Sequence, residues 1–162
     1  MADRETAGLA AKVLTVSDGV IAGTRQDGSG DALVEMLTGE GYEIVERRAV
    51  EDGVESVRNA LLDMSDGFSG LIATTGGTGF GPRDLTPEGT AAVLERRAEG
   101  LAEASRLVSP FGRLSRAIAG TRGQALIVNL PGSPRGSVEC LGAVIDVVPH
   151  ALRLLADQPT EH

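Results

Sequence analysis

The chain has 162 residues, enough for one ordinary domain with a sizeable core. Aromatic residues make up only 2%, the two histidines stand at positions 150 and 162, and Cys140 is the single cysteine. A histidine–cysteine zinc site, a disulfide framework and an aromatic platform for single-stranded nucleic acid are therefore not expected. The net charge of −8 argues against nucleic acid or an anionic membrane as a partner, because both require a positive field.

Composition also constrains the location and the chemistry. No apolar run approaches the roughly 18–20 residues that span a bilayer, and the chain opens with acidic residues where a signal peptide needs basic ones. A single cysteine suits a reducing compartment, so we expect a cytoplasmic protein. Lys12 is the only lysine, which excludes any mechanism that needs a lysine on a glycine-rich phosphate loop.

The N-terminal half of the chain alternates strand and helix patterns. Residues 10–17 form an apolar run of strand length, and a polar, glycine-rich loop follows over residues 18–29. Apolar residues at helical spacing predict a helix over residues 31–40, which Gly41 ends. Residues 42–50 alternate as a second strand, before Asp52 and the helical pattern that follows it.

The C-terminal half continues this alternation. Residues 71–75 are a short buried strand, and Thr86 followed by Pro87 predicts a helix capped by the threonine. Residues 90–109 have a helical composition, in one piece or two, and residues 125–130 form the clearest strand. Residues 137–156 predict two helices that meet at Pro149.

We therefore predict a loose leader over residues 1–9 and a single domain over residues 10–157. The domain is expected to be an α/β three-layer sandwich with a mainly parallel sheet. Ligands bind beyond the carboxyl ends of the strands in such sheets. Glycine-rich loops follow the strands after Ser17, Thr75 and Leu130, and we expect these loops to converge at one edge.

The loop over residues 75–86 is the sharpest local signal. Its glycines let backbone N–H groups approach an anion closely, and Thr75 and Thr78 add hydroxyl donors. The helix that begins at Thr86 would turn its N-terminus toward the same site. The alternative is a loop that is merely tight.

Two carboxylates are candidates for this site: Asp84 lies within the loop, and Asp52 follows the second strand. Asp84 beside an anion site makes sense where Mg²⁺ bridges the carboxylate and phosphate oxygens; a surface ion pair or an Asx-turn is the alternative. Asp52 could help to hold the metal. A helix cap also explains Asp52, because Asp52 and Glu55 have the spacing of a capping box.

The remaining loops suit a polar, phosphorylated ligand. Asp18 could accept hydrogen bonds from the amino groups of a heterocycle, and Arg25 could pair with a phosphate, although this loop could also be a plain surface segment. The segment over residues 129–137, with Ser133 and Arg135, is a second anion loop or a turn set by proline and glycine. We interpret Cys140 as a core residue and assign no catalytic role to His150.

Five strings, in order, resemble the MogA/MoaB molybdopterin-binding family, which includes the G domain of gephyrin. The strings are TVSDG at 15–19, DGSG at 27–30, TTGGTGFGPRDLTPE at 74–88, LSRAIAGTRG at 114–123 and NLPGSPRGSVECL at 129–141. The similarity covers about residues 10–156. It implies an α/β fold that binds molybdopterin, in a homotrimer or a dimer of trimers and with other cofactor-biosynthesis enzymes as further partners.

The resemblance also implies a reaction and a set of site residues. Catalytic members adenylate molybdopterin: its terminal phosphate attacks the α-phosphorus of Mg-ATP and pyrophosphate leaves. Asp52 and Asp84 correspond to the acids needed for catalysis and Mg²⁺ handling. The resemblance implies substrate and phosphate binding by the residues of three segments, namely Ser17, Asp18, Thr75, Gly76, Gly77, Thr78, Gly79, Pro131, Gly132, Ser133 and Arg135. With one lysine in the chain, Arg25, Arg83 and Arg135 are the nearest sources of positive charge.

Three functions remain open at this stage. The first is a molybdopterin adenylyltransferase that uses ATP and Mg²⁺. The second is a protein that binds molybdopterin without adenylating it: several catalytic members carry arginine where this chain has Gly19, and the chain has the short length of the MoaB-like branch, not all of whose members adenylate. The third is another pterin enzyme such as a carbinolamine dehydratase, which the two histidines outside the loops disfavour.

Overall fold

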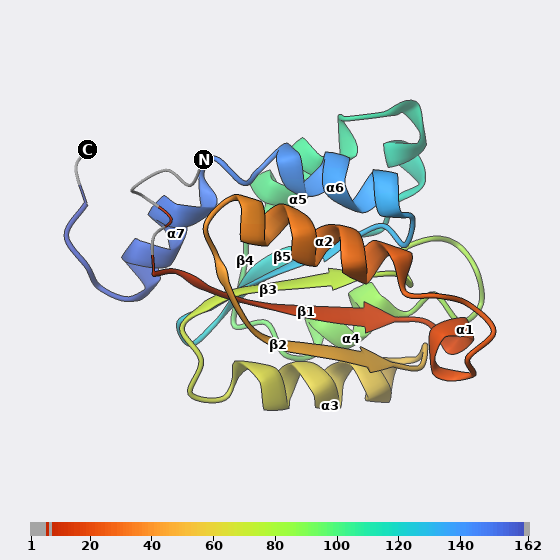
Figure 1. Ribbon diagram of the computed structural model, residues 1–162. Helices are drawn as coiled ribbons and strands as arrows, with labels where there is room; N and C mark the ends of the chain where they lie inside the picture. Colours follow the sequence, from red (N-terminus) through yellow and green to blue (C-terminus); the bar gives the residue numbers. More distant parts are fainter. Residues whose placement is uncertain (1–5, 7, 161–162) are drawn as a thin grey trace.

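A six-stranded sheet forms the middle of the computed structural model, which describes residues 6 and 8–160 (Figure 1). The strand order is β2-β1-β3-β6-β5-β4. The strands are β1 (Ala10–Val16), β2 (Glu43–Val50), β3 (Gly70–Thr75), β4 (Arg96–Arg97), β5 (Ala119–Arg122) and β6 (Ala125–Leu130). β1, β2, β3 and β6 are parallel, and β5 runs antiparallel to both of its neighbours.

Helices cover both faces of the sheet, so the predicted three-layer α/β sandwich is confirmed (Figure 1). One face carries α2 (Gly28–Gly39), α5 (Glu99–Arg106), α6 (Pro134–Gly142) and α7 (Val148–Leu155). The other face carries α3 (Val54–Ser65) and α4 (Thr86–Ala91). The short helices α1 (Asp18–Ile21) and η1 (Pro110–Leu114) lie in connecting segments.

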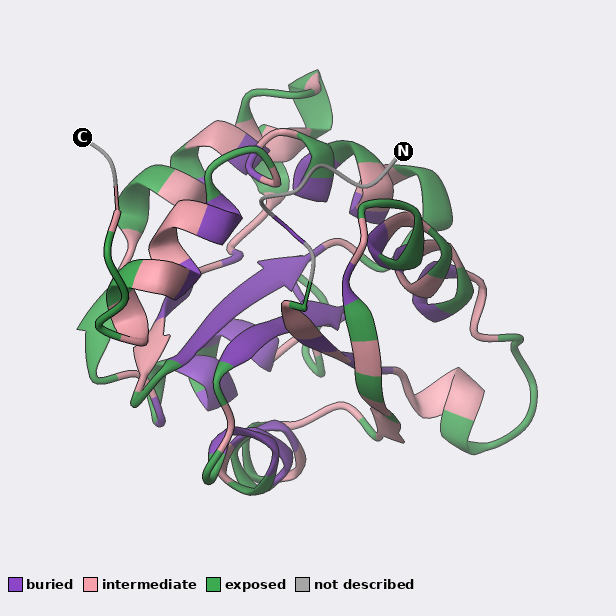
Figure 2. Cartoon of the chain, turned by 60° about the vertical axis from the view of Figure 1, so that its left-hand side comes forward, coloured by how far each residue is buried: buried purple, intermediate pink, exposed green. Residues whose placement is uncertain are grey.

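The core consists of two hydrophobic clusters, one on each side of the sheet. Leu33 and Leu37 of α2 and Leu141 of α6 pack on one face, while Leu61 and Met64 of α3 pack on the other. Figure 2 shows the buried residues concentrated in the central strands, with exposed residues on the outer sides of the helices. The outward-facing polar helix surfaces and the apolar central strands explain the sequence periodicity.

Register places the ends of the parallel strands side by side. Val16 pairs with Val50 across β1 and β2, and Thr75 pairs with both Thr15 and Leu130. The arrowheads of β1, β2 and β3 point to the same edge in Figure 1, where α1 also lies. The loops that follow these strands therefore begin side by side at one edge of the sheet.

Several element boundaries differ from the sequence predictions. Helix α2 begins at Gly28, three residues early, because the Asp27 carboxylate accepts the N–H of Gly30 and caps it. Thr86 is the first helical residue of α4 and not its cap, because its buried hydroxyl donates to the Gly76 carbonyl at 2.8 Å. The helical prediction for residues 90–109 is right only for α5 and the end of α4, since β4 lies between them.

Two further predictions concern the N-terminal leader and membrane crossing. Most of the predicted leader, residues 1–5 and 7, lies outside the described residues; within the remainder, the Leu9 N–H donates to Thr6 O at 3.0 Å. Along residues 6 and 8–160, none of the helices has both the length and the apolar character that crossing a membrane requires.

Candidate functional site

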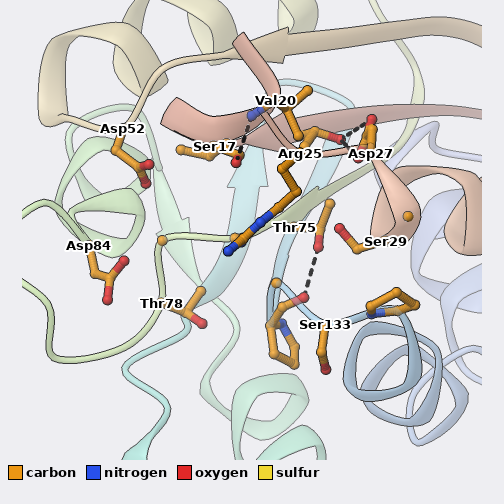
Figure 3. A pocket seen from close by; sticks show the side chains of 18 of the residues that line it. Ser17, Val20, Arg25, Asp27, Ser29, Asp52, Thr75, Thr78, Asp84 and Ser133 are labelled. Atoms are coloured by element: carbon orange, nitrogen blue, oxygen red, sulfur yellow. Dashed lines mark hydrogen bonds between the residues drawn. The ribbon is translucent and has the colours of Figure 1, made fainter. Parts of the chain in front are cut away.

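A polar pocket of about 740 Å³ opens at the carboxyl edge of the sheet. Three loops meet there, after β1, β3 and β6, which confirms the predicted convergence. The start of α2, the start of α6 and Asp52 complete the lining (Figure 3). The lining residues are Thr15, Val16, Ser17, Val20, Arg25, Gln26, Asp27, Gly28, Ser29, Asp52, Thr75, Gly76, Gly77, Thr78, Gly79, Asp84, Pro131, Gly132, Ser133 and Pro134.

Glycine is required where the three loops approach one another. Gly76 has φ +100°, and a Cβ there would lie 2.2 Å from the Val16 carbonyl oxygen. A Cβ on Gly132 would lie 3.3 Å from the Gly76 Cα. The Thr75 hydroxyl donates to Pro131 O at 2.7 Å, which joins the β3 and β6 loops. These contacts bring the backbone amides of two loops to one wall of the pocket.

Asp84 lies at the end of the glycine-rich loop. Its carboxylate accepts the Gly81 N–H at 2.9 Å, and its own N–H donates to the Gly81 carbonyl at 3.0 Å. This turn differs from the predicted Asx-turn, in which the carboxylate would accept an N–H two residues further along the chain. The carboxylate lines the pocket (Figure 3).

Arg116 secures this loop from outside, a role that the sequence analysis missed. Its backbone N–H donates to Thr78 O at 2.9 Å, and its Nε donates to Gly79 O at 2.8 Å. Its guanidinium also donates to the Asp84 carbonyl and to the Glu88 carboxylate. Only its position in the LSRAIAGTRG string signalled Arg116, because a contact across 37 residues of sequence leaves no local pattern.

Asp52 does not cap α3, so the capping-box interpretation is wrong. The N-cap of α3 is Gly53, which makes no side-chain capping bond. Asp52 Oδ2 instead accepts the Asp18 N–H at 2.9 Å, and Asp18 Oδ1 accepts the Asp52 N–H at 3.1 Å. Residue 53 has φ +134°, a conformation that turns the chain away before the helix begins.

The carboxylates of Asp18 and Asp52 have opposite electrostatic environments. A hydrogen bond from Arg83 Nε to Asp18 Oδ2 at 2.6 Å lowers the pKa of Asp18. Burial raises the pKa of Asp52, and the negative charges of Asp18 and Asp84 raise it further. Because like charges oppose ionisation, a nearby cation would stabilise the ionised form of Asp52.

The Asp27 carboxylate accepts hydrogen bonds from three residues and caps the start of α2. It accepts the Thr15 hydroxyl at 2.8 Å, the Gly30 N–H at 3.0 Å and Arg47 Nη2 at 3.0 Å. Its charge is therefore balanced by the Arg47 ion pair. The N-terminal ends of α2, at Gly28 and Ser29, and of α6, at Ser133 and Pro134, line the same pocket. Helix N-termini favour anions.

The predicted site residues line this pocket, with two exceptions. Asp18 lies beside Asp52 but outside the lining, with its carboxylate bonded to Arg83. Arg135 pairs with Glu139 at 2.8 Å, its side chain is 90% exposed, and it lines a second pocket of about 420 Å³ under η1. Of the three candidate arginines, only Arg25 lines the main pocket. Cys140 lies in the core as predicted, and burial raises its pKa.

The donor set fits a magnesium ion shared with a ligand. Within residues 6 and 8–160, no cluster of three or more histidine, cysteine or acidic side chains could hold a metal by itself. Asp52 and Asp84 nevertheless face one pocket, and the negative charge of Asp84 raises the pKa of Asp52. Mg²⁺ is commonly bound by one or two carboxylates together with substrate phosphates, so two carboxylates are enough.

Fold and site together define an α/β protein with a glycine-rich pocket at the carboxyl ends of its parallel strands. Residues 12–153 match the MoCF_biosynth family, described as "Probable molybdopterin binding domain". The chain therefore belongs to this family of molybdopterin-binding domains. The family resemblance of the sequence strings is confirmed.

Individual relatives agree with this assignment. A molybdopterin adenylyltransferase of Helicobacter pylori (strain J99) is 37% identical over 150 residues, which cover 88% of this chain and 85% of the relative. Gephyrin of Dictyostelium discoideum is 38% identical over 161 residues, but the match spans only 22% of gephyrin. The crystal structure of the molybdopterin biosynthesis enzyme MoaB from Thermus thermophilus has a TM-score of 0.88 and 44% identity, covering 94% of this chain and 99% of that one.

Proposed function

We propose that this protein is a molybdopterin adenylyltransferase that transfers AMP from Mg-ATP to the terminal phosphate of molybdopterin. The observation that carries the proposal is the presence of Asp52 and Asp84 in one pocket with the Thr75–Gly79 backbone loop. The H. pylori relative, matched over most of both chains, bears the name of this activity. A pocket of about 740 Å³ has room for a small phosphorylated ligand.

The reaction needs positioning and charge neutralisation more than a general base. A phosphate monoester is largely dianionic at neutral pH, so its oxygen is already a nucleophile. This oxygen forms a bond to the α-phosphorus of ATP, the bond from that phosphorus to the β-phosphate bridging oxygen breaks, and pyrophosphate leaves. The absence of histidine from the pocket lining is consistent with such a step.

Asp52 and Asp84 are the residues that would hold Mg²⁺. When bound, the ion would neutralise phosphate charge and polarise the phosphoryl group. Asp84 is kept in place by its turn with Gly81 and by Arg116, and Asp52 by its exchange of hydrogen bonds with Asp18. Because the charges of Asp18 and Asp84 raise the pKa of Asp52, a bound cation would also relieve the repulsion between these acids.

Each of the three loops would bind a different part of the ligand. Backbone amides at Gly77 and Gly79, with the Thr78 hydroxyl, suit phosphate oxygens, whereas the Gly76 N–H already donates to Leu130 O at 3.1 Å and lines the pocket as backbone. Ser17 on one side, with Pro131, Gly132 and Ser133 on the other, would line the pterin. Asp18 would act through Asp52, because its own carboxylate bonds Arg83. Arg135 stands in the second pocket and would contact only a ligand that extends past Ser133.

We further propose a homotrimer, or a dimer of trimers, in the cytoplasm. Large apolar side chains stay exposed in the single chain: Leu107 is 86% exposed, Phe111 80% and Phe80 70%. A monomer would leave these side chains in water, which favours a subunit contact. Buried Cys140 is the only thiol and suits a reducing compartment. Light scattering at micromolar concentration tests the assembly; a monomer would contradict it.

Pyrophosphate release tests the proposed activity. The protein, ATP, Mg²⁺ and molybdopterin should together release pyrophosphate, and omission of molybdopterin or of Mg²⁺ should stop the release. Asp84→Asn should lower the rate about 100-fold or more, while molybdopterin still binds. Folded wild-type protein that binds molybdopterin tightly but releases no pyrophosphate would instead support a binding protein and reject the enzyme.

A further inference from the structure

Arg25 is the one positively charged side chain that lines the main pocket among the described residues. The other charged lining residues are Asp27, Asp52 and Asp84. Asp27 is neutralised by its ion pair with Arg47 at 3.0 Å. Asp52 and Asp84 accept hydrogen bonds only from backbone N–H groups within the described residues. Among the described residues, the carboxylates of Asp52 and Asp84 thus have no side-chain cation as a partner, and the same pocket contains the cation of Arg25.

The guanidinium of Arg25 forms no hydrogen bond or ion pair with any residue that the structure describes. Figure 3 shows its side chain extending from the β1 loop into the pocket. The other basic side chains near this edge are engaged elsewhere. Arg83 bonds Asp18, and Arg116 bonds Glu88. Lys12, the single lysine, lies in the first half of β1, away from this edge, where it pairs with Glu46 at 3.2 Å and donates to Met64 O.

The loop that carries Arg25 is built as a closed turn. The backbone N–H groups of Thr24 and Arg25 both donate to Gly19 O, at 3.0 and 3.1 Å. A Cβ on residue 19 would lie 3.2 Å from the Arg25 Cβ, closer than side chains normally pack. Gly19 therefore leaves the room in which the Arg25 side chain crosses toward the pocket.

We propose that Arg25 binds a phosphate group of the incoming ligand and is the side-chain cation of this site. The guanidinium is planar and donates two parallel hydrogen bonds to phosphate oxygens, which a lysine does not match. Arg25 lines the same pocket as Asp52 and Asp84, the two residues that would hold Mg²⁺, so a phosphate bound by Arg25 would lie in that pocket. The inference rests on the proposed function for the identity of the ligand, since both ATP and molybdopterin carry phosphate.

Binding measurements without turnover test this role. Affinities for the non-hydrolysable analogue α,β-methylene-ATP with Mg²⁺, and for molybdopterin, are measured separately on wild type, Arg25→Gln and Arg25→Lys. Arg58→Gln is the matched control, because Arg58 is an exposed arginine on α3 outside the pocket lining. Arg25→Gln should weaken binding of at least one ligand about 10- to 100-fold, the range for one charged hydrogen-bond pair. Arg25→Lys should retain part of that affinity, and Arg58→Gln should bind as wild type does.

The separate measurements with the nucleotide analogue and with molybdopterin identify which ligand carries the phosphate that Arg25 binds. Loss for the nucleotide analogue alone assigns Arg25 to ATP, and loss for molybdopterin alone assigns it to the pterin phosphate. Affinity of the Arg25→Gln variant should also depend less steeply on salt concentration. Wild-type affinity of Arg25→Gln for both ligands would overturn the proposal. This outcome is distinct from failure of the enzyme proposal, in which the wild type would bind ligand and form no product.

Discussion

Asp18 and Asp52 exchange hydrogen bonds across the carboxyl ends of β1 and β2, each carboxylate accepting the backbone N–H of the other residue, at 2.9 and 3.1 Å. Arg83 links the loop after β3 to these two residues, because it donates to the Asp18 carboxylate at 2.6 Å and to Asp52 O at 2.8 Å. Three loops that are distant in sequence are thus joined around one carboxylate that faces the pocket. We infer that this arrangement orients Asp52 for metal binding.

Replacing Arg83 should lower activity and Mg²⁺ binding while leaving the stability of the fold nearly unchanged. Arg83→Gln removes the link between the β3 loop and Asp18, so Asp52 becomes less well oriented. We predict a fall of about 10-fold in kcat/KM and weaker binding of Mg²⁺, measured by titration at saturating ATP. The midpoint of urea denaturation should stay close to that of the wild type, because the Arg83 side chain is exposed.

The control for Arg83 is another exposed ion pair. Arg97→Gln breaks the pair with Glu99 at 3.0 Å, outside the pocket lining, and should leave kcat/KM unchanged. Equal kinetic losses in both variants would mean that Arg83 has no special relation to the site.

Asp52→Asn should abolish activity without loss of stability at neutral pH. Burial and the charges of Asp18 and Asp84 raise the Asp52 pKa above 3.8, so ionised Asp52 costs stability. That cost is absent below the unfolded pKa, grows as pH rises, and is complete above the folded pKa. The amide oxygen of asparagine can still accept the Asp18 N–H. Thermal denaturation at pH 7 should give the variant a Tm equal to or above that of the wild type.

The pH profile provides the control for this prediction. The stability advantage of Asp52→Asn should shrink as pH falls below the folded pKa of Asp52, because both proteins then carry a neutral side chain. Mg²⁺ should raise the Tm of the wild type more than that of the variant. A variant that is less stable than wild type from pH 4 to pH 8 would show that the carboxylate has a structural role.

Gly77 cannot carry a side chain in this loop. It has φ +68°, and a Cβ would lie 2.2 Å from Thr86 Oγ1 and 3.2 Å from Asp52 Oδ1. We predict that Gly77→Ala destabilises the protein by about 1–3 kcal/mol and disturbs Asp52. Urea denaturation measures the change.

Gly39→Ala is the matched control for Gly77. Gly39 lies in α2, and a Cβ there would have nothing within 4 Å, so alanine should stabilise the helix by about 0.5–1 kcal/mol. Equal effects of the two substitutions would contradict a steric requirement at Gly77.

Asn129 connects the central strands to α4. Its Nδ2 donates to the hydroxyls of Thr74 and Thr90, both at 3.0 Å, and its Oδ1 accepts the Ile118 N–H at 3.2 Å. Asn129→Ala leaves buried partners unsatisfied, so the free energy of unfolding should fall by about 3 kcal/mol. Exposed Asn59→Ala should change it by less than about 0.5 kcal/mol. A loss below about 1 kcal/mol for Asn129→Ala would contradict this role.

The sequence predicts the four parallel strands because β1, β3 and β6 are short apolar runs and residues 42–50 alternate between apolar and polar side chains. It misses β4 and β5, since Arg96–Arg97 and Ala119–Arg122 have little strand character. These segments are extended because they pair with a neighbour: Arg97 with Gly120, and Ala119 with Val128. Pairing partners distant in the chain override local propensity.

The same limit applies to the site. Thr75, Gly76 and Asp84 were predictable because the motif lies within one loop. The exchange between Asp18 and Asp52 depends on register between strands, and Arg116 acts from a segment 37 residues away from Gly79. Spacing alone therefore favoured a local cap for Asp52, whereas its partner belongs to the adjacent strand's loop.

Transfer of label from ATP to the pterin tests adenylyl transfer most directly. Wild-type protein is incubated with Mg²⁺, molybdopterin and ATP labelled at the α-phosphorus, and the products are separated by chromatography. We predict labelled adenylyl-molybdopterin in one-to-one yield with pyrophosphate, formed at least about 100-fold more slowly by Asp84→Asn. Tight molybdopterin binding by folded wild-type protein, with all label remaining in ATP, would contradict the proposed activity.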